Sequence, residues 1–299
     1  MIEKMIDSSN NVILSPILTL YRSAINMKPN VVTSEMFFFR NGYWDISAII
    51  GPYLLFALWV GPRMMANRKP FELRTTILIY NIFMVILNVY FFFSSIIAYE
   101  FGTALTNFKY PANDTRELSV EDHRRLTFVY WYFISKIIDL MDTVFFILRK
   151  KWSQVTALHV YHHSSVPFCV WLATSFAPTA GVNGIFPILN SAVHVLMYTY
   201  YALSAFGPSV QRYLWWKRYI TQIQLIQFVI FFLYGMTYVI KQTGWPLILI
   251  GVSMAQPPLY LFMFTSFYLN TYCNARAKSH RSCNTTDRAS IKQNISKLE

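Results

Sequence analysis

The sequence predicts an all-α, polytopic membrane protein built as a bundle of about seven transmembrane helices. Of its 299 residues, 55% are hydrophobic and only 13% are charged, whereas soluble domains carry about 25% charged residues. Seven stretches are long and apolar enough for a helix to cross a bilayer, which takes about 20 residues. They are 46–65, 75–99, 126–148, 155–176, 185–206, 219–240 and 247–268.

The chain is organised as one membrane domain between two polar ends. Charged residues, among them Glu3, Lys4 and Asp7, precede the first long apolar stretch, which is not the order of a cleavable signal peptide. No repeat, low-complexity tract or Gly/Ser linker divides the rest of the chain. We therefore predict a luminal N-terminal segment over 1–45, a membrane domain over 46–271 and a cytosolic, polar and basic tail over 272–299.

The distribution of lysine and arginine predicts the orientation, because cytosolic loops carry the excess of these residues. They concentrate in the connections 63–74, 149–151 and 212–218 and in the tail. This places the N-terminus in the lumen and the C-terminus in the cytosol, and it accounts for most of the net charge of +12 without a nucleic-acid partner. Asn113, in an Asn-Asp-Thr triplet of a luminal loop, is predicted to accept a glycan.

Polar side chains interrupt four consecutive stretches, and each group repeats at the spacing of one helix face. Ionisable groups inside a bilayer are costly and mark functional sites more often than structural ones. Counted from the basic connections, several lie roughly 10 to 15 Å deep at 1.5 Å per residue, so we expect all four groups to face one cavity in the cytosolic half. A structural ion-pair network and interhelical hydrogen bonds remain alternatives. The groups are Lys136, Asp139, Asp142 and Thr143; His159, His162 and His163; Asn190, His194, Met197, Tyr198 and Tyr201; and Thr221, Gln224 and Gln227.

The His-x-x-His-His run at 159–163 suggests two kinds of chemistry. Imidazoles are common metal ligands, but the six histidines of the chain are fewer than membrane di-iron oxygenases gather for two irons. A buried imidazole can also act as a nucleophile or as an acid and base. Attack on a thioester gives an acyl-imidazole, which can pass its acyl group on.

Five longer motifs occur in order, namely GPRMMANRKPFELR, YWYFISKIIDLMDTVFFILRKK, QVTALHVYHH, NSAVHVLMYTYYALSAFGP and YLWWKRYITQIQLIQF. Together they resemble the animal family of very-long-chain fatty acid elongases (ELOVL), strongly over 61–228 and overall over 45–273. The resemblance implies a seven-helix enzyme of the endoplasmic reticulum membrane that encloses a substrate tunnel. It further implies an acyltransferase, a very-long-chain 3-oxoacyl-CoA synthase, that condenses a long-chain acyl-CoA with malonyl-CoA into 3-ketoacyl-CoA, CoA and CO2, with no metal and no cofactor.

The resemblance also assigns roles. His159, His162 and His163 form the histidine box, and our hypothesis is that His162 accepts the acyl group. His194 is the candidate that polarises the malonyl carbonyl or moves a proton, and Asp142, Asn190 and Gln224 hold imidazoles and carbonyls in place. The predicted substrate-binding residues are Lys136, Asp139, Thr143, Asn190, Tyr198, Tyr201, Thr221, Gln224 and Gln227, with Lys150, Lys151, Lys217 and Arg218 near the CoA phosphates.

The predicted partners are acyl-CoA, malonyl-CoA and membrane lipid, with other enzymes of the elongation cycle by family analogy, and a homo-oligomer is left open. Elongases usually have Glu where this chain has Asp139. The alternative functions are a histidine-box metal oxidoreductase acting on lipid and a non-enzymatic seven-helix transporter.

Overall fold

A computed structural model describes residues 27–111 and 116–274 of the chain. Its described part is helical, and its only β contact is an isolated bridge between Lys109 and Thr243. Helices cover each of the seven predicted stretches, which confirms the all-α prediction. The predicted glycan acceptor Asn113 and the tail from residue 275 onward lie outside the described residues.

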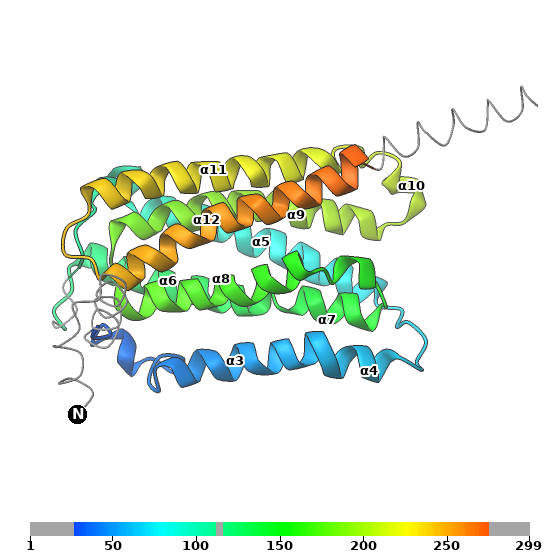
Figure 1. Ribbon diagram of the computed structural model, residues 1–299, viewed down its shortest axis with the longest axis horizontal. Helices are drawn as coiled ribbons and strands as arrows, with labels where there is room; N and C mark the ends of the chain where they lie inside the picture. Colours follow the sequence, from blue (N-terminus) through cyan, green and yellow to red (C-terminus); the bar gives the residue numbers. More distant parts are fainter. Residues whose placement is uncertain (1–26, 112–115, 275–299) are drawn as a thin grey trace, which may run out of the picture.

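The helices follow one another in antiparallel order along the bundle (Figure 1). The first, α3 (Tyr43–Leu55), runs through a π-helical turn (Phe56–Val60) into α4 (Gly61–Met65). The others are α5 (Arg74–Ala98), α6 (Val120–Ile138), α7 (Met141–Leu148), α8 (Ala157–Phe176), α9 (Ile185–Ala205), the short α10 (Pro208–Gln211), α11 (Lys217–Lys241) and α12 (Leu247–Tyr268).

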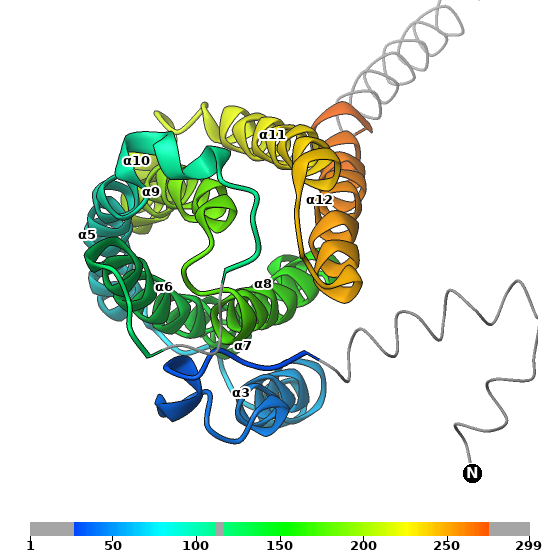
Figure 2. The same ribbon diagram turned by 90° about the vertical axis from the view of Figure 1, so that its left-hand side faces the viewer.

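The helices close into a ring. Helix α6 packs on α8, α8 on α12, α12 on α11, α11 on α9, α9 on α5, and α5 again on α6, as the view along the bundle shows (Figure 2). Helix α3 lies outside this ring against α8. We call the end of the ring at which α8 begins the histidine end, and the opposite one the far end.

The chain is a multi-pass membrane protein. Four helical stretches are long and apolar enough to cross a bilayer by themselves, namely Tyr43–Met65, Arg74–Ala98, Lys217–Lys241 and Leu247–Cys273. The remaining three helical segments, α6 with α7, α8 and α9, carry three of the four polar groups singled out in the sequence, and α11 carries the fourth. Their crossing of the bilayer, and with it the count of seven, stays a prediction.

Helix starts are fixed by side-chain caps that a hydropathy pattern does not report. Ser119 accepts a hydrogen bond from the backbone N–H of Asp122, at 3.0 Å, so α6 begins at Val120 and not at residue 126. Thr156 caps α8 in the same way through the N–H of His159, at 3.2 Å. Each cap satisfies one backbone donor that the first helical turn leaves free. The second cap also sets where the histidines start.

The predicted uninterrupted helix over 126–148 is wrong, because it breaks between α6 and α7. At the break the N–H of Asp142 bonds to the carbonyl of Asp139 at 3.2 Å, and that of Thr143 bonds to Leu140 at 3.2 Å. These are i to i+3 bonds, the 3₁₀ pattern, in which side chains three residues apart eclipse one another. The side chains of Asp139 and Asp142 therefore lie on the same side of this turn.

The turn between α8 and α9 requires glycine. A Cβ atom at Gly184 would run into the ring of Tyr99 and come within 2.8 Å of Leu105. We expect Gly184→Ala to destabilise the fold by about 1–3 kcal/mol, because a packed interior does not yield room for an added carbon without strain. Thermal unfolding in detergent measures this effect.

Gly51→Ala is the matched control, since a Cβ there meets nothing within 4 Å. Alanine is favoured over glycine inside a helix by about 0.5–1 kcal/mol, so this variant should be at least as stable as the wild type. Equal unfolding temperatures for both variants would contradict the packing argument.

Candidate active site

The three histidines of α8 have three different surroundings, although they lie within two turns of one helix. His159 Nε2 lies 2.8 Å from the hydroxyl of Thr143, which is itself 3.0 Å from the hydroxyl of Tyr53. His163 Nε2 lies 4.0 Å from an oxygen of Asp142. His162 packs its ring against those of Tyr260 and Phe264 on the other side of the helix. His159 and His163 of the predicted histidine box therefore contact polar groups of α7, whereas His162 contacts aromatic rings of α12.

A buried ion pair lies beside this cluster. The ammonium group of Lys136 contacts Asp139 Oδ2 at 2.9 Å and donates to Asn190 Oδ1 at 3.2 Å. Lys136 is 1% exposed and Asp139 is 5% exposed. The Tyr132 hydroxyl donates to the same oxygen of Asn190 at 2.9 Å. Charges inside a protein persist only when paired and hydrogen-bonded, and the lysine here has an acceptor at the end of α6 and another on α9.

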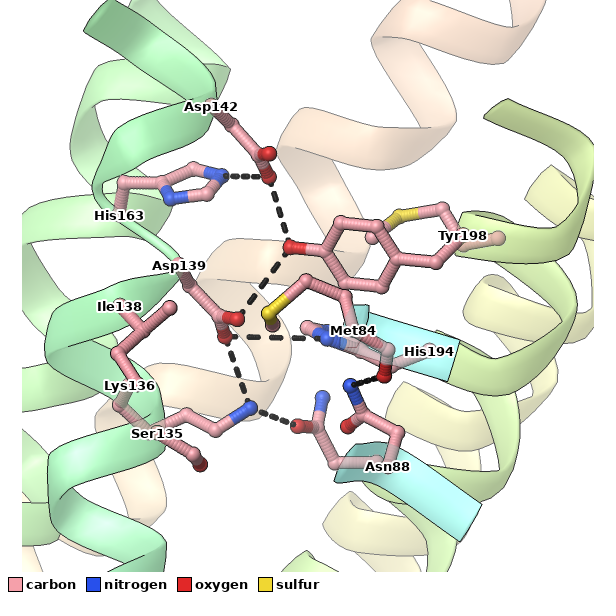
Figure 3. Close-up of polar contacts among 12 residues, drawn as sticks. Met84, Asn88, Ser135, Lys136, Ile138, Asp139, Asp142, His163, His194 and Tyr198 are labelled. Carbon is pink, nitrogen blue, oxygen red and sulfur yellow. Dashed lines mark hydrogen bonds and ion pairs between the residues drawn. The ribbon is translucent and has the colours of Figure 1, made fainter. Parts of the chain in front are cut away.

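Tyr198 joins the two carboxylates (Figure 3). Its hydroxyl lies 2.8 Å from Asp142 Oδ2 and 3.3 Å from Asp139 Oδ1. On the same helix, His194 Nδ1 lies 3.8 Å from Asp139 Oδ2 and makes no hydrogen bond. Asp139 thus faces a lysine, a tyrosine and a histidine at once, which the tight turn between α6 and α7 makes possible.

The groups on spans 3, 4 and 5 therefore meet in one polar cluster. Of the fifteen residues expected to face one cavity, only His162, Asn190 and Gln227 line the cavity described below. The group on span 6 makes none of the hydrogen bonds described above. Thr221 and Gln227 are buried, and Gln224 Nε2 contacts the sulfur of Met197 at 3.9 Å. Tyr201 makes an edge-to-face ring contact with Tyr198.

The basic residues predicted for the CoA phosphates lie at the histidine end, outside the buried cluster. Lys150 donates to the backbone carbonyl of Ala66 at 3.1 Å. The Arg218 guanidinium donates to the hydroxyl of its neighbour Tyr219 at 2.7 Å. Lys151 and Lys217 are exposed.

A largely apolar cavity of about 220 Å³ occupies the interior of the ring. Its polar end holds His162, Asn190, Gln227 and Tyr260. Its walls come mainly from α8, α9, α11 and α12, with Val166, Phe186, Phe231 and Val252 among the apolar side chains, and it extends to residues at the far end such as Trp245. Such a space suits a hydrocarbon chain better than a polar solute.

His162 is the only histidine of the described residues that lines this cavity. The ring of Tyr260, 5.5 Å from that of His162, and the side chain of Gln227 lie around it. The Gln227 carbonyl oxygen is buried and has no hydrogen-bond partner. His162 therefore stands between the ion-pair cluster and the apolar space. In the described residues, histidines, cysteines and carboxylates form no group of three or more that would hold a metal ion.

Sequence reasoning missed several polar contacts made by tyrosine. Tyr53 comes from α3, outside the ring, and reaches Thr143. Tyr132 bonds to Asn190, and Tyr260 of α12 bonds to Ser165 at 2.8 Å. From the sequence alone we interpret such tyrosines as packing residues or as residues that face lipid, because aromatic residues are frequent on membrane helices. Their hydroxyls at helical spacing from the polar groups were the available signal.

Comparison with known proteins agrees with the resemblance. The model of the GNS1/SUR4 family, ELO, matches residues 38–280. Very long chain fatty acid elongase 1 of Homo sapiens is 40% identical over 237 residues, which are 77% of this chain and 82% of that protein. Elongase 4 of Homo sapiens is 40% identical over 237 residues, covering 77% and 71% of the two chains. Elongase 7 of Rattus norvegicus is 38% identical over 226 residues, covering 75% and 79%. The chain therefore belongs to the ELO, or GNS1/SUR4, family, whose similar members include the very long chain fatty acid elongases.

Proposed function

We propose that this protein is a fatty acid elongase that condenses a long-chain acyl-CoA with malonyl-CoA and releases 3-ketoacyl-CoA, CoA and CO2. The single observation that carries the proposal is the largely apolar cavity whose polar end holds His162. Family membership and the names of the relatives support the substrate class. The position of His162 supports its role as the group that accepts the acyl chain.

The first half-reaction loads the acyl chain. A ring nitrogen of His162 attacks the thioester carbon, the C–N bond forms and the C–S bond breaks. The proton of the imidazole leaves with the thiolate as CoA thiol, and the acyl-imidazole retains a reactive carbonyl. The acyl tail extends into the apolar cavity, where burial of its methylene groups stabilises the complex by about 0.8 kcal/mol each.

The second half-reaction forms the new carbon–carbon bond. Malonyl-CoA loses CO2 to leave an enolate, whose carbon attacks the acyl carbon while the C–N bond to His162 breaks. The imidazole takes up one proton from solvent, so each turnover consumes a proton. In this proposal His194, whose Nδ1 makes no hydrogen bond, polarises the malonyl carbonyl, and Asp142, Asn190 and Gln224 orient the groups around it.

The proposal also states where the substrates enter and how the protein is oriented in the membrane. Acyl-CoA and malonyl-CoA approach from the histidine end, where Lys150, Lys151, Lys217 and Arg218 attract the CoA phosphates. That end faces the cytosol and the far end faces the lumen of the endoplasmic reticulum, as the excess of lysine and arginine predicts. The 3-ketoacyl-CoA product then requires a reductase as the next enzyme.

Malonyl-CoA incorporation by the purified protein tests the proposal. A panel of acyl-CoAs of increasing length is supplied with labelled malonyl-CoA, with and without a metal chelator, and 3-ketoacyl products are measured by mass spectrometry. We expect product with at least one chain length and no loss in chelator. Absence of product across the panel would overturn the assignment, and loss of product in chelator that returns with added metal would overturn the metal-free mechanism.

A further inference from the structure

A line of three side chains connects helix α3, which packs outside the ring (Figure 2), with the histidine box. The Tyr53 hydroxyl of α3 lies 3.0 Å from the Thr143 hydroxyl of α7, and that hydroxyl lies 2.8 Å from Nε2 of His159 on α8. Tyr53 is 7% exposed and Thr143 is 0% exposed. Tyr53 does not line the cavity, so its hydroxyl can act on the histidines only through Thr143.

The number of hydroxyl protons determines the direction of these two bonds. Each hydroxyl has one proton to donate and can also accept. Within the part of the chain that the structure describes, the Tyr53 hydroxyl has Thr143 as its one partner, and the Thr143 hydroxyl has Tyr53 and His159. If His159 Nε2 donated to Thr143, one of the two hydroxyl protons would have no acceptor. Both protons are used only when Tyr53 donates to Thr143 and Thr143 donates to Nε2.

This direction selects one form of the imidazole ring of His159. A neutral imidazole carries its proton on one nitrogen and accepts with the other, and the bond made by one nitrogen sets the state of the other. With Nε2 as the acceptor, the proton is on Nδ1. A buried donor without an acceptor is costly enough to favour this arrangement about tenfold.

The ring of His159 lies against the rest of the histidine box. Its centroid is 4.2 Å from that of His163, and the His163 centroid is 5.5 Å from that of His162. His163 also lies 4.0 Å from Asp142. Because the three rings pack in sequence, the orientation of His159 constrains that of His163, which packs against the side chain that accepts the acyl group in the proposed reaction.

We propose that Tyr53 is a positioning residue for the condensation. It holds the Thr143 hydroxyl, and Thr143 holds His159 in one orientation with the proton on Nδ1. Donation by Tyr53 also polarises the Thr143 hydroxyl, since hydrogen bonds in a chain strengthen one another. The proposal rests on the proposed elongase function and assigns a role in it to a helix that lies outside the ring.

Condensation by single and double variants tests the coupling. Tyr53→Phe should lower kcat about three- to tenfold, the effect of one hydrogen bond, and leave KM for both CoA thioesters unchanged. Thr143→Val should lower kcat further, whereas Thr143→Ser, which keeps the hydroxyl, should retain most of the wild-type rate. In the Thr143→Val background, Tyr53→Phe should have no additional effect, because the two residues act as a unit.

Tyr43→Phe is the matched control on the same helix, because Tyr43 is 52% exposed and packs its ring against Trp171. Its kcat should equal that of the wild type. An unchanged kcat in Tyr53→Phe would overturn the proposal. An equal loss on adding Tyr53→Phe to the wild type and to Thr143→Val would also overturn it, because a merely structural tyrosine acts independently of Thr143.

Nitrogen NMR of the resting protein reports the state of His159 without turnover. The protein is labelled with ¹⁵N-histidine, and the His159 signals are those that disappear in His159→Gln. We expect an unprotonated, hydrogen-bonded Nε2 in the wild type, and in Tyr53→Phe a shift of this signal toward that of a free imidazole nitrogen. A protonated Nε2 in the wild type, or an unchanged signal in Tyr53→Phe, would overturn the proposal. The expected signals without condensation by the wild type would refute the proposed function and leave the hydrogen-bond relay intact.

Discussion

His162→Ala is expected to lower condensation by at least about 10³-fold, because removal of the covalent nucleophile leaves only binding and positioning. His162 lines the cavity and its ring packs against Tyr260 and Phe264. His159 and His163 lie instead beside Thr143 and Asp142. His159→Ala and His163→Ala should therefore lower the rate less, by roughly 10- to 100-fold, as expected for groups that position a nucleophile.

The acylated protein gives a direct measurement. When acyl-CoA is supplied without malonyl-CoA, the intact mass of the wild type should increase by one acyl group, located on His162 by peptide mapping. His162→Ala should show no such increase, and His123→Ala, which changes an exposed histidine on α6, should behave as the wild type. A stable adduct in the His162→Ala variant, or undiminished product, would assign the nucleophile to another residue.

The fold was predictable because the bilayer constrains it strongly. Backbone polar groups inside a membrane must be satisfied within each span, so an apolar stretch of sufficient length predicts a helix. The seven helical stretches follow from this rule. The break between α6 and α7 does not, since neither Asp139 nor Leu140 is a glycine or a proline that would signal it. Pro167, which does carry such a signal, lies within the continuous α8.

The candidate site was predictable in part for a related reason. Lys136, Asp142 and His194 are conspicuous because a charged or ionisable side chain in the bilayer is costly. Tyr132 and Tyr53 are not conspicuous, because tyrosine is compatible with packing, with lipid and with hydrogen bonding. Only the packing of the helices, including that of α3 against α8 outside the ring, reveals which tyrosine hydroxyls face the cluster. Within α6 and its C-cap, the spacing of three residues brings Asp139, shorter than the usual glutamate, to 2.9 Å from Lys136.

Lys136→Met is expected to destabilise the protein by about 3–5 kcal/mol, because removal of one partner leaves a buried charge unpaired. Lys136 is the cation that contacts Asp139, and it also donates to Asn190. Methionine replaces its volume without replacing its charge, so the loss is electrostatic and not a cavity effect. Unfolding in mixed detergent and denaturant measures the change, with Lys109→Met, an exposed lysine, as the matched control.

The double variant Lys136→Met, Asp139→Asn separates stability from function. It removes both charges of the pair, so it should recover most of the stability lost in Lys136→Met, since neutral replacement of a buried ion pair is often tolerated. Condensation should not recover, because Asp139 also faces His194 at 3.8 Å and Tyr198 at 3.3 Å. Recovery of activity together with stability would mean that the ion pair has only a structural role. Equal instability of the single and double variants would mean that the unpaired carboxylate is not the cause.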